Sequence, residues 1–471
     1  MRITIREVHP KSKFCEQITL ETLHRVIPPE TLHHVLTEGG VVTPRVRKLS
    51  LPGVALWVIA LNLFRDHSTE EVYEAMAGGL DLLWTEGEEI KEDPLPGASA
   101  LSYRRKQLGA RPMAALFRRI CRPLATPQTK GAFRFGLRLM ALDGSTESVP
   151  DTPQNGSAFG GPSNQHGSGA YPQVRGIYLC ECGTHALVDA CFWPYARAEQ
   201  EGAHRLLRSV GPGMLVTGDR GVHSFSLLWG VRERGAHALF RLPASVAFTR
   251  IRTLPDGSVL AWLSQGVSRG ERGKALRGRS LLVRVVEYTF SDPALPGYGE
   301  VHRLVTTLLD PEQAPALELA CAYHERWEIE GVIDEKDTHL RLADRPLRSR
   351  TPVGVIQELY GALLAHYAIR FLMHEAAVRE GVDPDRLSFT HTLRVVRQAV
   401  LSEGWIDPLH QPQLYGRLLT KIARGKLPPR RCRSNPRVVK RQQSKFPVKR
   451  PEHRSPPKPA CDTFDEAVVL I

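Results

Sequence analysis

The sequence of 471 residues has no apolar run long enough to cross a membrane. Its longest run, Val54 to Leu61, continues only to Phe64 before Arg65 and is about half of what a bilayer requires, so it predicts a buried helix. Residues 1–14 carry scattered charges and no apolar segment, which argues against a secretion signal. We therefore expect a cytoplasmic protein without a membrane partner.

The chain also has no pair of CxxC motifs of the kind that hold structural zinc. Its eight cysteines are spread along the whole length. Cys180 and Cys182 point to one side of a strand-like run, but no two further ligands stand at a suitable spacing. Reduced structural thiols are the better interpretation.

Acidic residues are scarce near the C-terminus. Between Arg417 and Lys458 there are 15 Lys or Arg and one acid, Glu452, which makes a net charge of +14. The whole chain carries +13, so the remainder is nearly neutral. A polycationic tail on a neutral body indicates a polyanionic partner; a tail that only aids solubility is the alternative.

The other compositional features are those of a folded protein. The hydrophobic fraction is 42%, and 39 Gly and 35 Pro are far from fibrous levels. A chain of 471 residues is too long for one simple core, so two to four units are expected.

Residues 20–125 predict helices. Pro28-Pro29 opens one of them, and Ser68 followed by Glu71 forms a capping box. A third helical segment, Ser102 to Cys121, carries a basic cluster made of Arg104, Arg105, Lys106, Arg118 and Arg119. We interpret this region as a DNA-binding domain; the solvated face of an ordinary helical bundle is the alternative.

From Arg134 the pattern becomes α/β. The predicted order is βββαβαβ, with strands at 137–142, 174–180 and 186–192, a helix at 199–210, a strand at 214–217, a helix at 224–234 and a strand at 238–242. This is the strand order of an RNase H-like core. Asp143 and Asp219 stand at the C-terminal ends of its first and fourth strands.

Strand signals dominate residues 243–310 and interrupt this core as an all-β insertion. The chain turns helical again from about Ala314, and residues 353–401 predict two more amphipathic helices. The predicted domains are 1–125 (N-terminal helical DNA-binding domain), 126–242 (first part of the RNase H-like core), 243–310 (β insertion), 311–350 (last core helix), 351–415 (C-terminal helices) and 416–471 (basic, disordered tail).

Cleavage of a phosphodiester in such a core needs two divalent metal ions about 3.5–4 Å apart, held by hard oxygen ligands. Asp143 and Asp219 supply two carboxylates, and Glu330 in the helix after the insertion supplies a third. An Asp-Gly pair at a strand end is often only a turn, so the hypothesis rests on the combination.

The helix of Glu330 also carries groups suited to phosphate. At 100° per residue, Tyr323 and Arg341 each lie about 20° from Glu330, and Arg326 lies within about 60° of Tyr323. Arginine suits phosphate because its planar fork donates two parallel hydrogen bonds. One helical stripe therefore combines an acid for metal with cations and a phenol for DNA.

Three segments resemble the acidic blocks of DDE transposases of the insertion-sequence-4 family. They are Leu142-Asp143-Gly144-Ser145-Thr146 with Val149-Pro150-Asp151-Thr152-Pro153, then Thr217-Gly218-Asp219-Arg220-Gly221, and then Tyr323-His324-Glu325-Arg326-Trp327-Glu328-Ile329-Glu330. Ile27-Pro28-Pro29-Glu30 and Leu63-Phe64-Arg65-Asp66 with Glu70-Glu71-Val72 resemble that family's N-terminal domain. The resemblance covers about residues 20–345.

The resemblance implies a cut-and-paste transposase in which Asp143, Asp219 and Glu330 bind two Mg²⁺ ions, for which Mn²⁺ can substitute. Water attacks at the transposon end, the freed 3′-hydroxyl forms a hairpin with the other strand, the hairpin is reopened, and the 3′-ends are joined to target DNA. The implied partners are double-stranded DNA, as terminal inverted repeats and target, and a second copy in a synaptic homodimer. The implied location is the bacterial cytoplasm, at the nucleoid.

Tyr323 and Arg326 match the family's Tyr-x2-Arg-x3-Glu-x6-Lys signature, but its lysine position holds Asp337. Lys336 or Arg341 is the expected substitute. The last two expected DNA contacts are Arg220 and Trp262, the latter stacking on a flipped base during hairpin formation. Two other functions stay open: an RNase H-like nuclease without strand transfer, and a catalytically degraded DNA-binding protein.

Overall fold

The computed structural model describes residues 25–41, 49–74, 96–164, 167–266, 271–295, 297–341, 346–401, 411–428 and 458–471. Two compact units make up the fold. Unit 1 comprises Met1–Ala132, Asp143–Leu206 and Glu328–Leu427, and unit 2 comprises Phe133–Leu142, Leu207–Trp327 and Pro428–Ile471. Cys15, Cys432 and most of the basic tail, including 436–440, lie outside the described residues.

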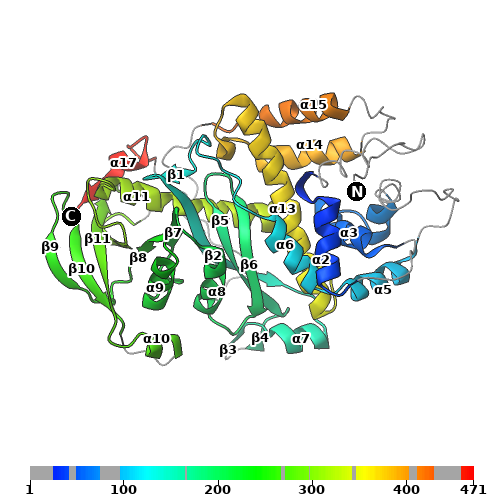
Figure 1. The fold of residues 1–471 in the computed structure, drawn as a ribbon, viewed down its shortest axis with the longest axis horizontal. Helices are drawn as coiled ribbons and strands as arrows, with labels where there is room; N and C mark the ends of the chain where they lie inside the picture. Colours follow the sequence, from blue (N-terminus) through cyan, green and yellow to red (C-terminus); the bar gives the residue numbers. More distant parts are fainter. Residues whose placement is uncertain are drawn as a thin grey trace. The chain divides into compact units, whose positions relative to one another are not determined.

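The helices of unit 1 are arranged around α13 (Pro352–Glu380), which packs against α3 (Leu51–Leu63) and α6 (Arg111–Ile120) (Figure 1). Thr351 caps the start of α13 by accepting the Gly354 amide, and Gly381 ends it in the left-handed conformation at φ 63°. Further helices of unit 1 include α2 (Pro29–Glu38), α5 (Ala98–Leu108), α14 (Phe389–Leu401) and α15 (Gln411–Ala423).

Several helix predictions are confirmed. α3 contains the predicted buried apolar run, with every residue from Gly53 to Leu63 buried. The capping box forms as expected, since the Glu71 amide donates to Ser68 Oγ at 3.1 Å and the Ser68 amide donates to Glu71 Oε2 at 2.7 Å. The segment Ser102 to Cys121 is two helices rather than one, because Gly109 interrupts it at φ 70°. Within the described residues, no helix is both long and apolar enough to span a membrane.

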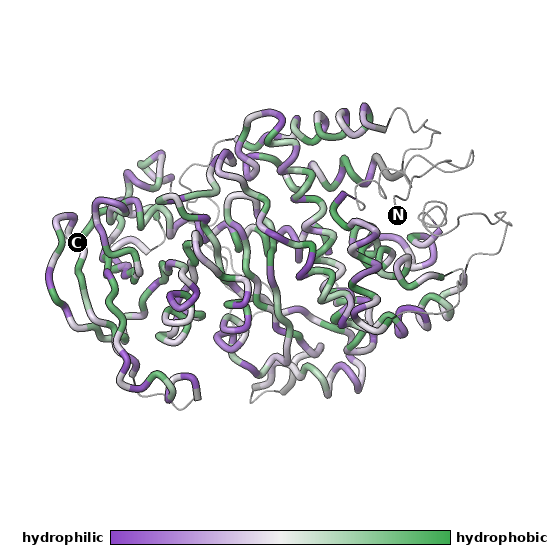
Figure 2. Tube along the Cα trace, in the orientation of Figure 1, coloured by the Kyte–Doolittle hydropathy of each residue, from purple (hydrophilic) through white to green (hydrophobic). Residues whose placement is uncertain are grey.

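The strands that unit 1 contributes to the large sheet are β5 (Gln173–Glu181), β6 (Ala186–Pro194) and the second half of β2 (Leu137–Ser148), in the order β6-β5-β2. β3 (Ser163–Asn164) and β4 (Gly167–Ser168) form a separate two-stranded sheet. β5 and β6 form an antiparallel hairpin. Hydrophobic residues follow one another along most of β6, which α8 (Glu199–Leu206) and α13 help to bury (Figure 2). A strand covered by helices needs no polar alternation, which is why 186–192 is apolar except for the buried Asp189.

Unit 2 is built on the strand order β2-β7-β8-β12-β11-β10-β9, which starts with the first half of β2. β7 (Met214–Gly218) pairs in parallel with β2 and with β8 (His237–Arg241), and α9 (Phe225–Glu233) connects β7 to β8. The predicted βββαβαβ order is therefore present along the chain, as β2, β5, β6, α8, β7, α9 and β8.

The strands of the predicted β insertion lie in the same sheet as those of the core. They are β9 (Thr249–Thr253), β10 (Val259–Ser264), β11 (Ser280–Phe290) and β12 (His302–Thr306), with the short helix α10 (Glu271–Ala275) among them. β12 pairs antiparallel with β8, with Val305 opposite Phe240, so these strands extend the sheet that β7 and β8 begin. The edge of β8 is thereby covered rather than left open.

Two further expectations are corrected. β2 continues five residues beyond Asp143, so this aspartate lies within the strand and not at its end. The helix predicted around Glu330 is not uniform: it runs as α11 (Ala316–His324), the 3₁₀ turn η2 (Glu325–Trp327), α12 (Glu328–Asp334) and the π-helix η3 (Glu335–Leu340). Because 3₁₀ and π turns change the rotation per residue, the 100° per residue assumed for the stripe from Tyr323 to Arg341 does not apply along the whole segment.

The segment predicted as a disordered tail is ordered at both ends. α15 extends to Ala423, and residues 464–470 form α17 (Phe464–Ala467) and β13 (Val468–Leu470). β13 pairs antiparallel with β11, and the Phe464 ring stacks on His324 with centroids 3.8 Å apart. Composition predicted that this tail cannot fold alone, and these last residues fold on a surface that the rest of unit 2 provides.

We expect Phe464→Ala to release this C-terminal segment, because β13 lies at an edge and Phe464 contacts both His324 and Phe290. Amide hydrogen exchange of Val468 to Leu470 should accelerate strongly while the global melting temperature changes little. Val469→Ala is the control, since this side chain is exposed. Unchanged protection in Phe464→Ala would contradict this account of the segment.

Candidate active site

Asp143 lies on β2 in unit 1, half-buried, and its Oδ1 accepts the Gly144 amide at 2.8 Å. Gly144 has little room for a side chain, because a Cβ there would lie 3.0 Å from the Gly176 carbonyl oxygen and 3.2 Å from the Glu199 carboxyl carbon. Glu199, the first residue of α8, therefore packs against Gly144 on the face of β2 opposite to the Asp143 side chain, and it pairs with Arg175 at 2.9 Å. The sequence analysis did not select Glu199, because a helix-start glutamate is usually solvated.

Asp219 lies in unit 2, directly after β7, and is also half-buried. Its Oδ1 accepts two backbone amides, from Gly221 at 2.8 Å and from Val222 at 3.1 Å. The turn therefore holds this carboxylate in one orientation. Thr217 Oγ1 donates to the Met140 carbonyl oxygen at 3.1 Å and ties β7 to β2 just before the acid.

Tyr323 and Arg326 lie together in unit 2, at the junction of α11 and η2. The Arg326 guanidinium is 5.8 Å from the centre of the Tyr323 ring and 5.6 Å from that of Trp327. Burial raises the pKa of Tyr323, although the charge of Arg326 opposes the shift, so the phenol is neutral near pH 7. Trp327 is 50% exposed and is an aromatic group that the sequence analysis did not select for DNA contact.

Glu330 lies on α12 in unit 1 and is half-buried, whereas the two cations expected to help it are not at the surface. Lys336 is 1% exposed and Arg341 is 5% exposed, and both form ion pairs with Glu147 on β2. This arrangement corrects the expectation that either cation presents itself to DNA: a phosphate cannot reach them in this conformation.

The basic cluster of the N-terminal helices is also corrected in part. Arg104 is buried and donates through Nε to the Leu49 carbonyl oxygen at 2.8 Å. Arg105 donates to Gln357 and Ser349, so it holds α5 against α13. Lys106, Arg118 and Arg119, the other members of the cluster, are exposed. The remaining two selected residues lie at the surface of unit 2, where Arg220 is exposed and Trp262 on β10 is 43% exposed.

A buried ionic cluster in unit 1 was not predicted. His185, in the turn between β5 and β6, faces Glu328 at 2.7 Å and Glu335 at 3.3 Å, and Glu335 also pairs with His366 and Arg370. His185, Glu328 and Asp385 bring three potential metal ligands together. The guanidinium of Arg370, which contacts both His185 and Glu335, already supplies the positive charge, so we interpret the cluster as structural.

Cysteine plays no part in these sites among the described residues. Six cysteines are present there as free thiols. Cys180 and Cys182 are both buried, and burial raises the pKa of Cys180 well above its ordinary value. The prediction of reduced structural thiols is consistent with this environment.

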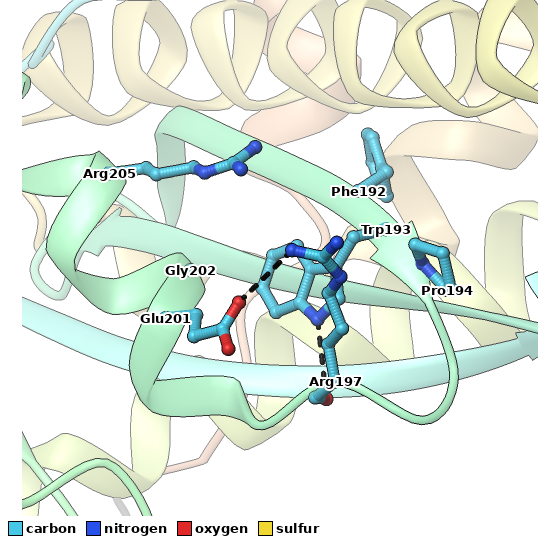
Figure 3. Close-up of a pocket in the computed structure, with 7 residues that line it drawn as sticks. All are labelled: Phe192, Trp193, Pro194, Arg197, Glu201, Gly202 and Arg205. Carbon is cyan, nitrogen blue, oxygen red and sulfur yellow. Dashed lines mark hydrogen bonds and ion pairs between the residues drawn. The ribbon is translucent and has the colours of Figure 1, made fainter. Parts of the chain in front are cut away.

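A cavity of about 270 Å³ opens between β6 and α8 in unit 1 (Figure 3). It is lined by Phe192, Trp193, Pro194, Arg197, Glu201, Gly202 and Arg205. Gly202 is required at this place, because a Cβ would lie 1.8 Å from the Trp193 ring. Two arginines line it, and one of them, Arg197, pairs with Glu201 at 3.5 Å.

Two family models match the chain. The model described as "Insertion element 4 transposase N-terminal" matches residues 17–118, and the "Transposase DDE domain" model matches residues 134–368. A relative from Escherichia coli (strain K12), "Transposase InsG for insertion sequence element IS4", is 29% identical over 434 residues, which are 91% of this chain and 94% of the relative. The chain belongs to the insertion-sequence-4 family of DDE transposases.

This insertion-sequence-4 transposase is therefore an enzyme that cleaves DNA and transfers strands. The resemblance recognised in the three acidic blocks and in the N-terminal segments is confirmed. A solved structure, the cryo-EM structure of the piggyBac transposase synaptic complex with hairpin DNA, is similar with a TM-score of 0.40 and 13% identity, covering 85% of each chain.

The Glu335 cluster of this transposase generates a stability prediction. Burial alone would raise the pKa of Glu335, but Arg370 and His185 beside it hold this pKa well below the ordinary value of 4.5. We expect Glu335→Gln to lower the free energy of unfolding by about 3–5 kcal/mol at pH 7, because Arg370 loses its buried counter-charge.

The lowered pKa of Glu335 also predicts how this stability difference changes with pH. A depressed folded pKa stabilises the native state above the unfolded pKa, and the stabilisation is lost as the pH falls through the folded pKa. The difference between wild type and Glu335→Gln in urea denaturation should therefore be full at pH 7 and shrink below about pH 4.5. A difference that stays constant down to pH 3 would show that the charge of Glu335 is not responsible.

Proposed function

We propose that this transposase cuts and joins DNA with Asp143, Asp219 and Glu330 as its metal-binding carboxylates. The observation that carries the proposal is that all three lie within the matched DDE domain and are half-buried, two of them with an oxygen held by backbone amides. Carboxylate oxygens at solvent-accessible positions are the ligands that Mg²⁺, or Mn²⁺, takes while retaining some of its waters. A pair of such ions activates the attacking oxygen and stabilises the leaving oxygen.

The protein's own groups would orient the DNA. Tyr323 and Arg326 offer a neutral phenol and a guanidinium side by side, which suits the oxygens of a phosphate. Arg220, exposed directly after Asp219, and Lys106 on α5 are proposed as further phosphate contacts. The basic segment between Arg417 and Lys458 would add salt-dependent contacts that do not depend on sequence.

The proposed reaction proceeds by water attack at the transposon end, attack of the freed 3′-hydroxyl on the opposite strand, reopening of the hairpin, and joining to target DNA. The order of β2, β5, β6, β7 and β8 supports an RNase H-like core as its framework. We further propose that the N-terminal helices read the inverted repeats and that two copies act together at the nucleoid in the synaptic complex.

The first experiment is cleavage and joining of a labelled DNA that carries the element's own end, in Mg²⁺ and in Mn²⁺. Asp143→Asn, Asp219→Asn and Glu330→Gln should each reduce nicking by more than about 100-fold, because each removes a metal ligand. Asp334→Asn is the matched control, since this acid is on the helix of Glu330 but is exposed and pairs with His339 at 3.3 Å.

Three results separate the alternatives. Hairpin product and joining of the 3′-end to a plasmid support the transposase mechanism. Metal-dependent nicking without joining indicates a nuclease of the same core. Sequence-specific binding with no cleavage in wild type indicates a degraded DNA-binding protein, which the aspartate at position 337 would then help to explain.

Hairpin formation has its own test. Trp262 and Trp327 are the two exposed tryptophans of unit 2 in the described residues, and we propose that Trp262 stacks on a flipped base. Stacking on one base contributes about 1–3 kcal/mol, so Trp262→Ala should slow hairpin formation about 10- to 100-fold while first-strand nicking is retained. Tyr298→Ala, also at an exposed aromatic position, is the control. Loss of hairpin only in Trp327→Ala would transfer the role to Trp327.

A further inference from the structure

Glu147 is a carboxylate that neither the family signature nor the proposed chemistry uses. It lies on β2, is 4% exposed, and forms ion pairs with Lys336 and Arg341. Its Oε1 also accepts the Tyr178 hydroxyl at 3.4 Å. A buried carboxylate with two cationic partners needs an explanation, because such pairs seldom stabilise a fold more than apolar residues would.

The position of Glu147 on its strand connects it with Asp143. Side chains alternate across a β-strand, so Asp143, Ser145 and Glu147 share one face of β2. Tyr178 on β5 contacts this face, with its hydroxyl 3.4 Å from Ser145 Oγ and from Glu147 Oε1. The row of polar groups thus begins at the proposed metal ligand and ends at the ion pair.

The partners of Glu147 connect it with Glu330. Lys336 lies six residues after Glu330, inside the π-helix η3, and Arg341 directly follows η3. Both cations also contact Asp337, Arg341 at 3.4 Å, and the Lys336 ammonium lies 4.9 Å from the centre of the Tyr178 ring. Burial would lower the pKa of Lys336, but Asp337 beside it raises the pKa, so the amine stays charged.

The four charges form a neutral group: Glu147 and Asp337 balance Lys336 and Arg341. These ion pairs help to explain the π-helix η3. A helix that departs from i→i−4 hydrogen bonding is rare and needs tertiary contacts to stabilise it. The aspartate at the signature lysine position also has a role here, because it is the second counter-charge for two buried cations.

We propose that Glu147 is a positioning residue: by clamping η3 to β2 through Lys336 and Arg341, it sets the place of Glu330 relative to Asp143. Both acids belong to unit 1. Glu147 lies four residues after Asp143 on β2, and its partner Lys336 lies six residues after Glu330. The inference rests on the proposed function, because it takes Asp143 and Glu330 as metal ligands. It assigns Lys336 to protein structure rather than to phosphate.

The test compares Glu147→Gln with Glu358→Gln in the full chain bound to DNA carrying the element's end. Glu358 on α13 is the matched control, because it is also buried in unit 1 and also pairs with an arginine. Its partner is Arg65, which lies shortly after α3. Both variants should lower the melting temperature. Only Glu147→Gln should weaken Mn²⁺ binding, measured by electron paramagnetic resonance, by about 10- to 100-fold.

A second readout separates positioning from catalysis. In Glu147→Gln the Mn²⁺ concentration for half-maximal cleavage should rise by the same factor, while the rate at saturating Mn²⁺ recovers toward wild type. Glu147→Asp keeps the charge but shortens the side chain by one methylene, so its metal affinity should lie clearly below that of wild type and above that of Glu147→Gln. If Glu147→Gln is too unstable to purify, Glu147→Asp alone carries the test, with a metal affinity between wild type and Asp143→Asn expected.

The possible outcomes of the Mn²⁺ measurements distinguish the positioning role from the metal-ligand assignment. Wild-type Mn²⁺ affinity in Glu147→Gln, or in Glu147→Asp where only that variant folds, would overturn the positioning role and leave the proposed function intact. Mn²⁺ binding in wild type no stronger than in Asp143→Asn would instead overturn the assignment of the metal ligands, and with it this inference. Equal weakening in Glu147→Gln and Glu358→Gln would show a general effect of lost stability and would also overturn it.

Discussion

Buried carboxylates that must be neutralised determine the arrangement around η3. Glu335 points to Arg370 and two histidines, while Glu147 on β2 takes Lys336 and Arg341 from the same turn and its end. An unpaired charge in such a place would cost several kcal/mol, so each pair restricts the helix to one register. The π-helix is thus held from α13 and from β2 at once, and α12 with Glu330 precedes it directly.

The need to neutralise or hydrogen-bond buried polar groups also explains why four cations that the sequence placed at the DNA are buried or half-buried in unit 1. Lys336, Arg341, Arg104 and Arg105 are basic residues in helices, and sequence places such residues on solvated faces by default. In the structure each has carboxylate, amide or carbonyl partners within unit 1. The phosphate contacts that we propose are therefore groups that are exposed or that lie close to a proposed metal ligand along the chain, and they were not chosen from the number of cations on a helix.

The three proposed metal ligands are held in place by different kinds of structure: a strand, a turn and a helix. Asp219 is oriented by two amides of its own turn, so its placement is local. Asp143 is oriented by its strand, and Gly144 allows β5 and Glu199 to approach closely. Glu330 lies on α12, so its placement also depends on what holds α12 and η3. The sequence motif alone does not show that the three acids differ in how far their placement depends on tertiary contacts.

The sequence by itself determined the family, the α/β order along the chain, the buried helix at 51–63 and the capping box, because these depend on local periodicity, on short motifs and on residues near one another. It also located the three acids, although their shared site stays a proposal. Only the tertiary structure decided that β12 joins β8, that Val468–Leu470 pair with β11, that a π turn follows Glu330, and that Glu147 neutralises two cations about 190 residues away. These features depend on partners distant in sequence, and no local pattern specifies which distant charge or strand edge a residue will meet.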